Sequence, residues 1–251
     1  MTTETYERGF VDKILGDIFY TTTPKTRDTI ADVVNFDEST ALLAVACRTG
    51  DTAFHFTKTY NCKSVGVDFF EANIKEAEKT ARREKLTKMV TFIRSYAGDI
   101  PLDDNSFDVV VMERSLSCYD HKEEVVAECI RVLRPGGTFV MADFTVDDLD
   151  AADREDLKEL TCLVTALPKQ EYISIIESNG LSVESHDKKD LAEKKTKTLL
   201  LKWKKIRLFS NIFLKASAAD STRFEALMKK GEIAIKNRQL GYAIFIGTKP
   251  S

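Results

Sequence analysis

The sequence of 251 residues is poor in glycine and proline, with 11 Gly and 5 Pro, and it has no apolar run near 18 residues. This composition excludes a fibrous or low-complexity protein, and a hydrophobic share of 43% is too high for a disordered one. Without a long apolar run, no transmembrane helix is expected. The first residues, MTTETYERGF, lack a basic region followed by an apolar stretch, so no signal peptide is expected. These absences predict a cytoplasmic globular protein.

Paired cysteines are also missing. The five cysteines contain no C-x-x-C pair of the kind that zinc sites use; they are Cys47, Cys62, Cys118, Cys129 and Cys162. An odd number of cysteines without a secretory signal fits free thiols in a reducing compartment. We therefore expect no metal site.

Neither sign of charge is in large excess, because 37 Lys and Arg face 40 Asp and Glu, and the formal net charge is −3. Near-neutrality argues against a nucleic-acid-binding protein, which is normally basic. The charge is unevenly distributed, however. Residues 188–207 carry nine basic and two acidic residues, a local charge of +7, whereas the rest of the chain carries −10.

Short apolar runs alternate with longer segments of helical pattern. Strands are expected at 40–46, 64–67, 90–94, 107–112, 138–142, 181–185 and 240–248. Helices are expected at 51–60, 71–86, 121–133, 153–167, 169–179, 191–214 and 222–235. Arg134-Pro-Gly-Gly137 is expected to stop the third of these helices. Continuous apolar strands between helices indicate an α/β fold, in which a parallel sheet is covered on both faces.

Candidate binding residues follow the first three strands, where ligands bind in open α/β sheets. The loop from Ala44 to Gly50 (AVACRTG) has small residues and leads into a helix N-terminus, which favours a carboxylate or phosphate. Asp68 ends the second strand, where a carboxylate can accept both hydroxyls of a ribose. After the third strand, Asp99 is suited to accept a hydrogen bond from an adenine amino group, and Ile100 to pack on the adenine ring.

In this order and spacing, the sequence resembles class I S-adenosylmethionine-dependent methyltransferases over residues 35–185. The family's glycine-rich first motif corresponds to 43–50, its ribose-binding acid to Asp68 and its adenine-contacting acid to Asp99. The most specific match is RVLRPGG at 131–137. Residues 160–181 (LTCLVTALPKQEYISIIESNGL) resemble the small-molecule branch that includes quinone-biosynthesis and arsenite methyltransferases. The resemblance implies a Rossmann-like, seven-stranded, mostly parallel sheet with an antiparallel last strand and a helical cap.

The resemblance also implies S-adenosylmethionine as the cofactor. The residues it assigns to cofactor binding are Ala46, Cys47, Arg48, Gly50, Asp68, Phe69, Asp99, Ile100 and Glu113. The first motif departs from the family pattern, with Ala44 in place of an acid and with Ala46 and Arg48 in place of glycines. Three interpretations of Arg48 stay open: its guanidinium could pair with the cofactor carboxylate, point to solvent or into the cap, or block the site.

Methyl transfer needs little acid–base chemistry, because the sulfonium is already activated and the site has to align the acceptor and exclude water. The loop at 113–121 is expected to face the substrate. In it, His121 is the candidate base, with a solvated residue at a helix start as the alternative. Tyr119 is the second candidate for the catalytic site, as a residue that lines the pocket. Glu113 could orient a substrate or form a salt bridge.

Two features of the second half bear on the acceptor. Residues 194–216 (KKTKTLLLKWKKIRLFSNIFLKA) combine basic residues with a wide apolar stripe, which fits a lid helix or peripheral membrane contact, and the lid is favoured. Both options indicate a hydrophobic acceptor. Cys162 falls near a metalloid-binding cysteine of arsenite-methylating relatives, but a core or pocket-lining cysteine is the favoured interpretation.

We predict a single methyltransferase-like domain that methylates a small, hydrophobic acceptor. Its expected parts are N-terminal cap helices at 1–35, a cofactor-binding core at 36–150, a helical cap at 151–236 with a strand near 181–187, and a last strand at 237–251. The alternative is a methyltransferase-like binding or regulatory protein without catalysis, because the first motif is degenerate at Ala44, Ala46 and Arg48. The acceptor atom and the oligomeric state are left open.

Overall fold

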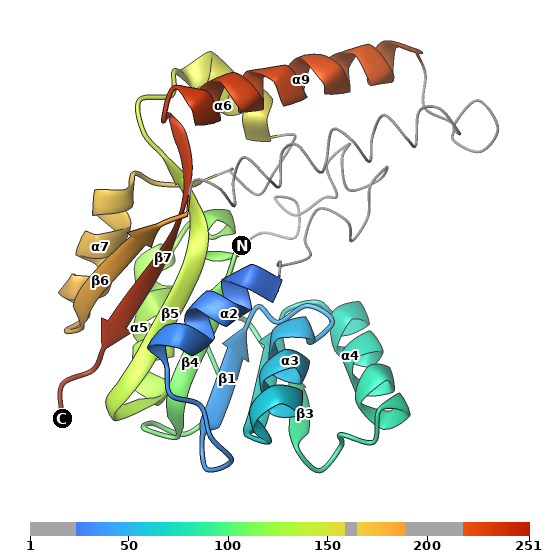
Figure 1. The fold of residues 1–251 in the computed structure, drawn as a ribbon, viewed down its shortest axis with the longest axis vertical. Helices are drawn as coiled ribbons and strands as arrows, with labels where there is room; N and C mark the ends of the chain where they lie inside the picture. Colours follow the sequence, from blue (N-terminus) through green and yellow to red (C-terminus); the bar gives the residue numbers. More distant parts are fainter. Residues whose placement is uncertain (1–23, 159–164, 189–217) are drawn as a thin grey trace.

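The computed structural model describes residues 24–158, 165–188 and 218–251 (Figure 1). Its centre is one seven-stranded sheet in the order β3-β2-β1-β4-β5-β7-β6. The strands are β1 (Ala41–Val45), β2 (Lys63–Asp68), β3 (Val90–Arg94), β4 (Phe107–Glu113), β5 (Leu133–Val146), β6 (Ser182–Asp187) and β7 (Leu240–Thr248). The first five strands pair in parallel, and β7 runs antiparallel to both β5 and β6. The predicted mostly parallel sheet with an antiparallel last strand is confirmed.

Helices lie on both faces of the sheet (Figure 1). One face carries α2 (Pro24–Val33), α3 (Asp51–Tyr60) and α4 (Glu71–Arg83), whereas α5 (Lys122–Val132) and α7 (Lys169–Ser178) cover the other. The helices α6 (Ala151–Lys158) and α9 (Ala218–Lys236) contact each other, beyond the end of β5 and the start of β7. A short 3-10 turn, η2 (Leu116–Cys118), follows β4.

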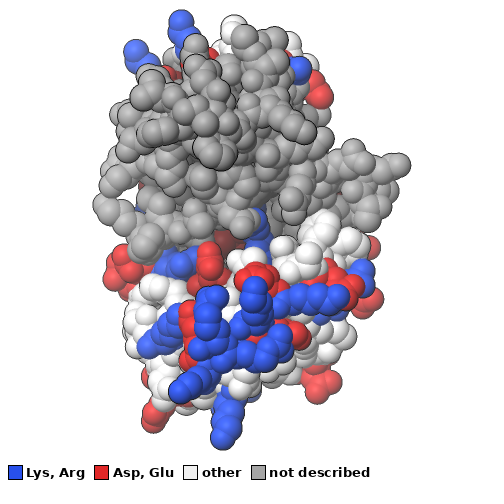
Figure 2. Space-filling model, turned by 90° about the vertical axis from the view of Figure 1, so that its right-hand side faces the viewer, with Lys and Arg blue, Asp and Glu red and all other residues white. Residues whose placement is uncertain are grey.

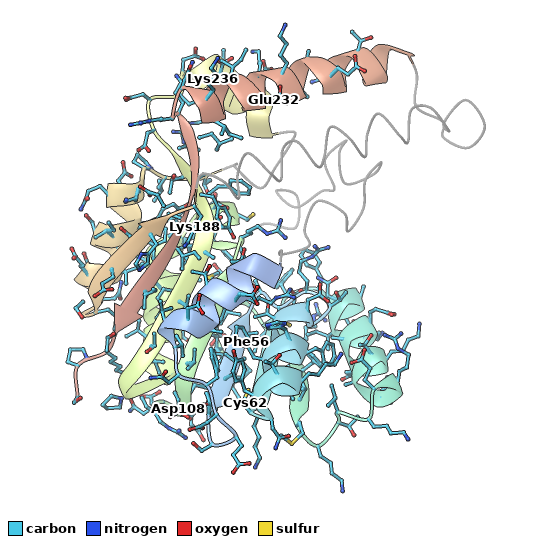
Figure 3. The ribbon with its side chains drawn as sticks, in the orientation of Figure 1. Phe56, Cys62, Asp108, Lys188, Glu232 and Lys236 are labelled. Atoms are coloured by element: carbon cyan, nitrogen blue, oxygen red, sulfur yellow. The ribbon has the colours of Figure 1, made fainter. Side chains whose placement is uncertain are left out.

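The core under α2 and α3 is built on alternate strand residues. Leu42 and Val109 of the sheet pack in one cluster with Ile30 of α2 and Phe56 of α3. The Phe56 ring, labelled in Figure 3, belongs to α3. It stacks on the ring of Phe36, with ring centroids 4.3 Å apart. Because successive strand side chains face opposite sides, these positions place α2 and α3 on one face of the sheet.

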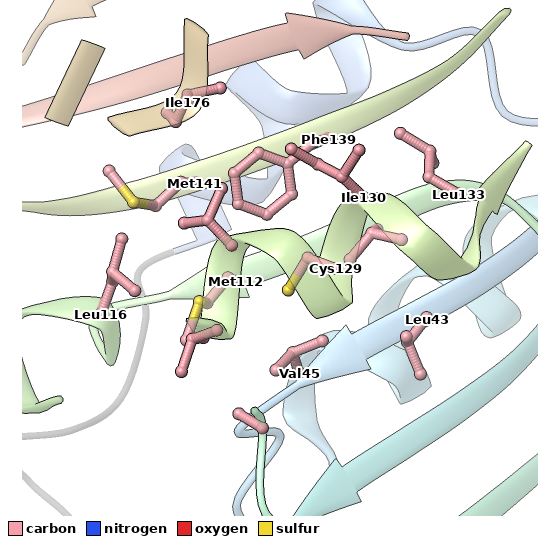
Figure 4. Packing of buried hydrophobic residues seen from close by; sticks show 14 of the residues in the cluster. Leu43, Val45, Met112, Leu116, Cys129, Ile130, Leu133, Phe139, Met141 and Ile176 are labelled. Carbon is pink, nitrogen blue, oxygen red and sulfur yellow. The ribbon is translucent and has the colours of Figure 1, made fainter. Parts of the chain in front are cut away.

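The opposite core uses the intervening strand residues. Leu43, Met112 and Met141 pack with Cys129 of α5 and Ile176 of α7, all of them fully buried (Figure 4). Since both faces of the strands are covered, they read as continuous apolar runs.

The predicted bounds of β5 and α6 differ most from the structure. The helix expected at 121–133 ends at Val132, before RPGG as predicted, but the strand expected from 138 begins already at Leu133, so residues 134–137 lie within β5. This strand is extended by pairing with the C-terminal segment, because Gly136 N donates to Lys249 O at 2.9 Å and Lys249 N donates to Gly137 O at 3.0 Å. The helix expected at 153–167 does not reach its predicted end, because residues 166–168 are not helical.

Acidic and basic side chains are interspersed on the face that carries α4 (Figure 2). On α4, Lys75 pairs with Glu71 at 2.6 Å and Lys79 pairs with Glu76 at 3.4 Å. Such exposed pairs contribute little to stability, because solvent and salt screen them. The basic window at 188–207, apart from Lys188, lies outside the described residues. Within the described part of the chain, no helix is long and apolar enough to cross a membrane.

Candidate cofactor-binding site

A cavity with an empty volume of about 860 Å³, part of it open to solvent, lies beyond the carboxyl ends of β1, β2 and β4. Its lining residues are 44–49, 51, 52, 68–70, 111, 113–115, 118 and 119. The strand order reverses here, since β2 and β3 follow on one side of β1 whereas β4 and β5 follow on the other. Open α/β sheets bind ligands at this switch point. The cavity therefore lies where the sequence predicts a site.

The loop after β1 has a backbone that favours glycine. Ala46, Arg48 and Gly50 have φ angles of 52°, 51° and 89°, all in the left-handed region. A residue with a Cβ is disfavoured there by ~1–2 kcal/mol. Ala46 and Arg48 stand where the resembled family has glycines, so the chain keeps the glycine-type backbone and places side chains on it. At Gly50 a Cβ would lie 2.6 Å from a ring carbon of Phe92, so packing as well as φ requires glycine.

Asp68 fastens this loop to the end of β2. Its side chain lies in the cavity wall and the residue is 5% exposed. Oδ2 accepts the backbone N–H of Arg48 at 2.8 Å, and Oδ1 accepts the N–H of Phe70 at 3.0 Å and Nδ2 of Asn73 at 2.9 Å. Because an ionised carboxylate has about four acceptor positions, one position on Oδ2 remains for a ligand hydroxyl.

Glu113, at the end of β4, is a further carboxylate of the cavity lining, and its side chain is 6% exposed, whereas Asp51 in the same lining is exposed. Oε2 accepts the hydroxyl of Thr52 from the first turn of α3 and lies 3.7 Å from Nε of Arg27 on α2. Within the described residues, the buried Oε1 has no hydrogen-bond partner. A buried acceptor left unsatisfied costs ~1–3 kcal/mol. The site therefore holds a carboxylate oxygen that a ligand donor would satisfy.

Tyr119 and Cys47 line the same cavity as uncharged groups. Tyr119 is 5% exposed, and burial, with a further contribution from the charge of Asp68, raises its pKa well above the usual value. The phenol therefore keeps its proton at neutral pH and is not a base. Burial and Asp68 likewise raise the pKa of the Cys47 thiol, so Cys47 is a packing residue rather than a nucleophile. Phe69, beside Asp68, adds an aromatic ring to the lining.

Four predicted residues do not line the cavity: Gly50, which lies in the loop but outside the lining, and Asp99, Ile100 and His121. Asp99 is exposed in a turn, where its N–H donates to Tyr96 O at 3.1 Å. Ile100 is 2% exposed in the core under α5, and its N–H donates to Glu128 at 2.9 Å. Ile100 is therefore a core residue in this structure rather than an open surface for a ring. His121 is exposed at the residue before α5, so the structure does not bring it together with Asp68 and Glu113.

The sequence did not point to four residues that shape the site, Arg27, Thr52, Phe70 and Asn73. Thr52 lies two residues after Gly50, and Phe70 lies two residues after Asp68. Their position at the start of α3 and just after β2 was the sequence signal that could have identified them. No sequence signal links Arg27 to Glu113, because only the packing of α2 on the sheet brings them together.

Comparison with known proteins identifies the domain that holds the cavity. Residues 43–141 match the family described as "Methyltransferase domain". A phthiotriol/phenolphthiotriol dimycocerosates methyltransferase of Mycobacterium tuberculosis is 39% identical over 117 residues, 46% of this chain and 42% of the relative. A 27-O-demethylrifamycin SV methyltransferase of Amycolatopsis mediterranei is 25% identical over 234 residues, 91% of this chain and 84% of the relative.

A solved structure, that of Haemonchus contortus phosphoethanolamine N-methyltransferase 2 in complex with S-adenosyl-L-methionine, has the same fold, with a TM-score of 0.77 at 17% identity. The similarity covers 97% of this chain and 60% of that one. Every residue that lines the cavity lies within the matched domain. Residues 43–141 thus match a methyltransferase domain, and the chain has the fold of class I methyltransferases. It spans 42% of the length of the mycobacterial relative.

Proposed function

We propose that this protein transfers a methyl group from S-adenosylmethionine to a small, hydrophobic acceptor. The observation that carries the proposal is the cavity between Asp68 and Glu113, within a methyltransferase domain and at the switch point of the sheet. The cofactor supplies a methyl group that its sulfonium already activates. The work left to the protein is to bind the cofactor, align the acceptor and exclude water.

The residues present fit such a cofactor. The cavity opens to solvent at the switch point of the sheet, where α/β folds bind small molecules. Asp68 keeps one acceptor position for a ribose hydroxyl, and Phe69 and Tyr119 supply apolar surface. We therefore assign Asp68 to the ribose and the loop from Cys47 to Gly50 to the methionine part of the cofactor.

Of the three interpretations of Arg48, we favour pairing of its guanidinium with the cofactor carboxylate. Arg48 is half-buried and lines the cavity, so its guanidinium is within the part of the site assigned to the methionine end of the cofactor. A planar guanidinium is suited to a carboxylate, because it can donate two parallel hydrogen bonds.

The acceptor is proposed at the level of chemical class only. The names of the two curated relatives specify phthiotriol or phenolphthiotriol dimycocerosates and 27-O-demethylrifamycin SV. Together with the apolar lining from Val111 and Tyr119, they support a hydrophobic small molecule. Membership in the quinone-biosynthesis and arsenite branch and a cytoplasmic location stay predictions. So do the roles of Cys162 and of 194–216 as lid or membrane contact, because both lie outside the described residues.

Calorimetric titration with S-adenosylmethionine tests the proposal. We expect binding, and we expect Asp68→Ala to weaken it about 10- to 150-fold, because hydrogen bonds to a charged group contribute ~1.5–3 kcal/mol. Asp108→Ala is the matched control. Asp108 lies at the amino end of β4, away from the cavity, and also accepts a backbone N–H, that of Ala41 at 2.8 Å (Figure 3).

The control variant should bind the cofactor as the unmodified protein does. Equal affinity of Asp68→Ala and the unmodified protein would show that the assignment of the ribose site is wrong. Absence of binding at millimolar cofactor would refute methyl transfer. It would leave a binding or regulatory protein without catalysis, the alternative that the degenerate positions Ala44, Ala46 and Arg48 suggest.

A further inference from the structure

Two ionisable side chains outside the cavity, Asp143 and Lys122, are almost fully buried, and the proposed function gives neither of them a role. Asp143 lies on β5 and is 0% exposed, whereas Lys122 begins α5 and is 4% exposed. Both bind the stretch 115–119, which contains η2. We propose that Asp143 and Lys122 are positioning residues, which hold this stretch in place as one wall of the cavity. The proposal rests on the proposed function and deepens it, because it states what fixes the geometry of that site.

The stretch 115–119 lines the cavity but has little structure of its own. Ser115, Cys118 and Tyr119 belong to the lining, whereas Ser117 does not. Within the stretch, Cys118 N donates to Ser115 O at 3.0 Å and Tyr119 N donates to Leu116 O at 3.1 Å. A single 3-10 turn of this kind has poor hydrogen-bond geometry. Its position against the sheet therefore depends on contacts from other elements.

Asp143 holds the stretch from the sheet. Its Oδ2 accepts the N–H of Ser117 at 2.9 Å, and its Oδ1 accepts the hydroxyl of Ser117 at 2.8 Å. Oδ1 also accepts the N–H of Phe144 at 2.7 Å, which fixes the carboxyl group on β5. Ser117 itself is 0% exposed. Because two atoms of Ser117 bind two oxygens of one carboxyl group, both the position and the rotation of the turn are set relative to β5.

Lys122 and Thr165 bind the carbonyl groups of the same stretch. Nζ of Lys122 donates to the carbonyl of Tyr119 and to Oγ1 of Thr165, the latter at 2.6 Å. The N–H of Thr165 donates to Ser117 O at 3.1 Å, and its hydroxyl donates to Tyr119 O at 2.9 Å. The stretch is thus bound through its donors by Asp143 and through its acceptors by Lys122 and Thr165.

These hydrogen bonds serve the geometry of the site more than the stability of the fold. Buried ionisable groups are costly to desolvate, and apolar replacements of similar volume are often neutral for stability. A fixed wall has a direct use in methyl transfer, which depends on alignment of the reacting groups and on exclusion of water. A displacement of about 1 Å at such a site can cost about 100-fold in rate. Asp143 and Lys122 act on the site through residues 115–119, because neither of them lines the cavity.

Ser117→Ala removes one of these hydrogen bonds without changing a lining residue. Its matched control is Ser64→Ala on β2, where the hydroxyl is buried as well and lies 2.6 Å from Oγ1 of Thr57, outside the lining. Both variants are expected to lower the free energy of unfolding. Ser117→Ala alone should weaken the binding of S-adenosylhomocysteine, the cofactor without its methyl group, about three- to tenfold in calorimetric titration. In the ligand-free protein it should also speed the alkylation of Cys118 by iodoacetamide about threefold or more.

Lys122→Met tests the partner on α5, because methionine keeps an unbranched side chain but has no donor group. We expect the same two effects, and this variant also serves if Ser117→Ala does not fold. The proposal is overturned if both variants, measured where they are folded, match the Ser64→Ala control in affinity and in alkylation rate. It is also overturned if alkylation becomes faster while the affinity stays unaltered, because the wall would then move without an effect on the site.

A failure of the proposed function gives a different result. If the unmodified protein does not bind S-adenosylhomocysteine, methyl transfer is refuted. The alkylation rates of Cys118 in the ligand-free proteins still show whether Asp143 and Lys122 hold the wall, so the two failures are distinguishable.

Discussion

The left-handed backbone at Ala46 predicts that a glycine substitution there stabilises the protein. Ala46 has a φ of 52°, where a Cβ costs ~1–2 kcal/mol. The gain from removing this Cβ is reduced by ~0.5–1 kcal/mol, because glycine has more freedom than alanine in the unfolded chain and loses more of it on folding. The methyl group borders the cavity and is partly exposed, so little packing is lost. Ala46→Gly should therefore raise the free energy of unfolding by ~0.5–1 kcal/mol.

Ala44→Gly is the matched control, the same chemical change two residues earlier. Ala44 lies within β1, is 1% exposed and packs with Phe54 and Ile74. Removing its methyl group loses ~0.8 kcal/mol of apolar burial. Glycine in a strand loses a further ~0.5–1 kcal/mol. The control should lower the free energy of unfolding by ~1.5 kcal/mol, so the two variants differ in sign.

Urea unfolding followed by circular dichroism measures both effects, with stability compared at an unchanged m value. In a thermal melt, 1 kcal/mol corresponds to a shift of ~2–4 °C in Tm for a domain of this size. Arg48→Gly, at a φ of 51°, should stabilise the fold in the same way while weakening cofactor binding. A loss of stability in Ala46→Gly as large as that in Ala44→Gly would refute the argument from the backbone.

Three further predictions concern packing, pH and access. Gly50→Ala should lower the free energy of unfolding by ~2 kcal/mol or more in urea, because its Cβ would lie 2.6 Å from Phe92 at a φ of 89°; an unchanged midpoint would contradict this. Burial raises the pKa of Asp143, which accepts the N–H of Ser117 at 2.9 Å. An acid with a raised folded-state pKa favours the native state at low pH. The unmodified protein should therefore lose stability relative to Asp143→Asn as pH rises from about 4 to 7, measured by urea titration at each pH. If the free energies of unfolding of the two proteins changed in parallel with pH, the raised pKa of Asp143 would be contradicted. Cys118 is half-buried and lines the cavity, so S-adenosylhomocysteine should slow its alkylation by iodoacetamide, measured by mass spectrometry; an unaltered rate would place the ligand elsewhere.

Elements with a strong local pattern were predictable from the sequence. The helix at 51–60 and the strands at 90–94 and 240–248 have the predicted bounds, because their apolar periodicity and flanking residues are encoded locally. The start of β5 was not predictable in the same way. Pro135 followed by two glycines is typical of a helix stop, and only pairing with the distant Lys249 keeps these residues in the strand.

In the candidate site, too, the residues fixed by local sequence were predictable, whereas those that depend on long-range packing were not. Asp68 and Gly50 were predicted because their positions depend on where β1 and β2 end. The contact of Arg27 with Glu113 was not predicted, because it depends on how α2 packs on the sheet. Ile100 has the chemical character of a ring-packing residue, but the hydrogen bond from its N–H to Glu128 holds its turn against the core. Burial of a turn residue depends on such long-range contacts, which residue type does not specify.

The ladder between β6 and β7 has a consequence for how the protein can evolve. Asp187 at the end of β6 pairs with Ala243 near the start of β7, so the chain between these strands leaves and re-enters the sheet at neighbouring positions. Residues of the predicted cap can therefore diversify while β1, β2 and β4 stay as they are. A cavity of fixed lining can in this way come to stand beside a succession of different caps in a lineage.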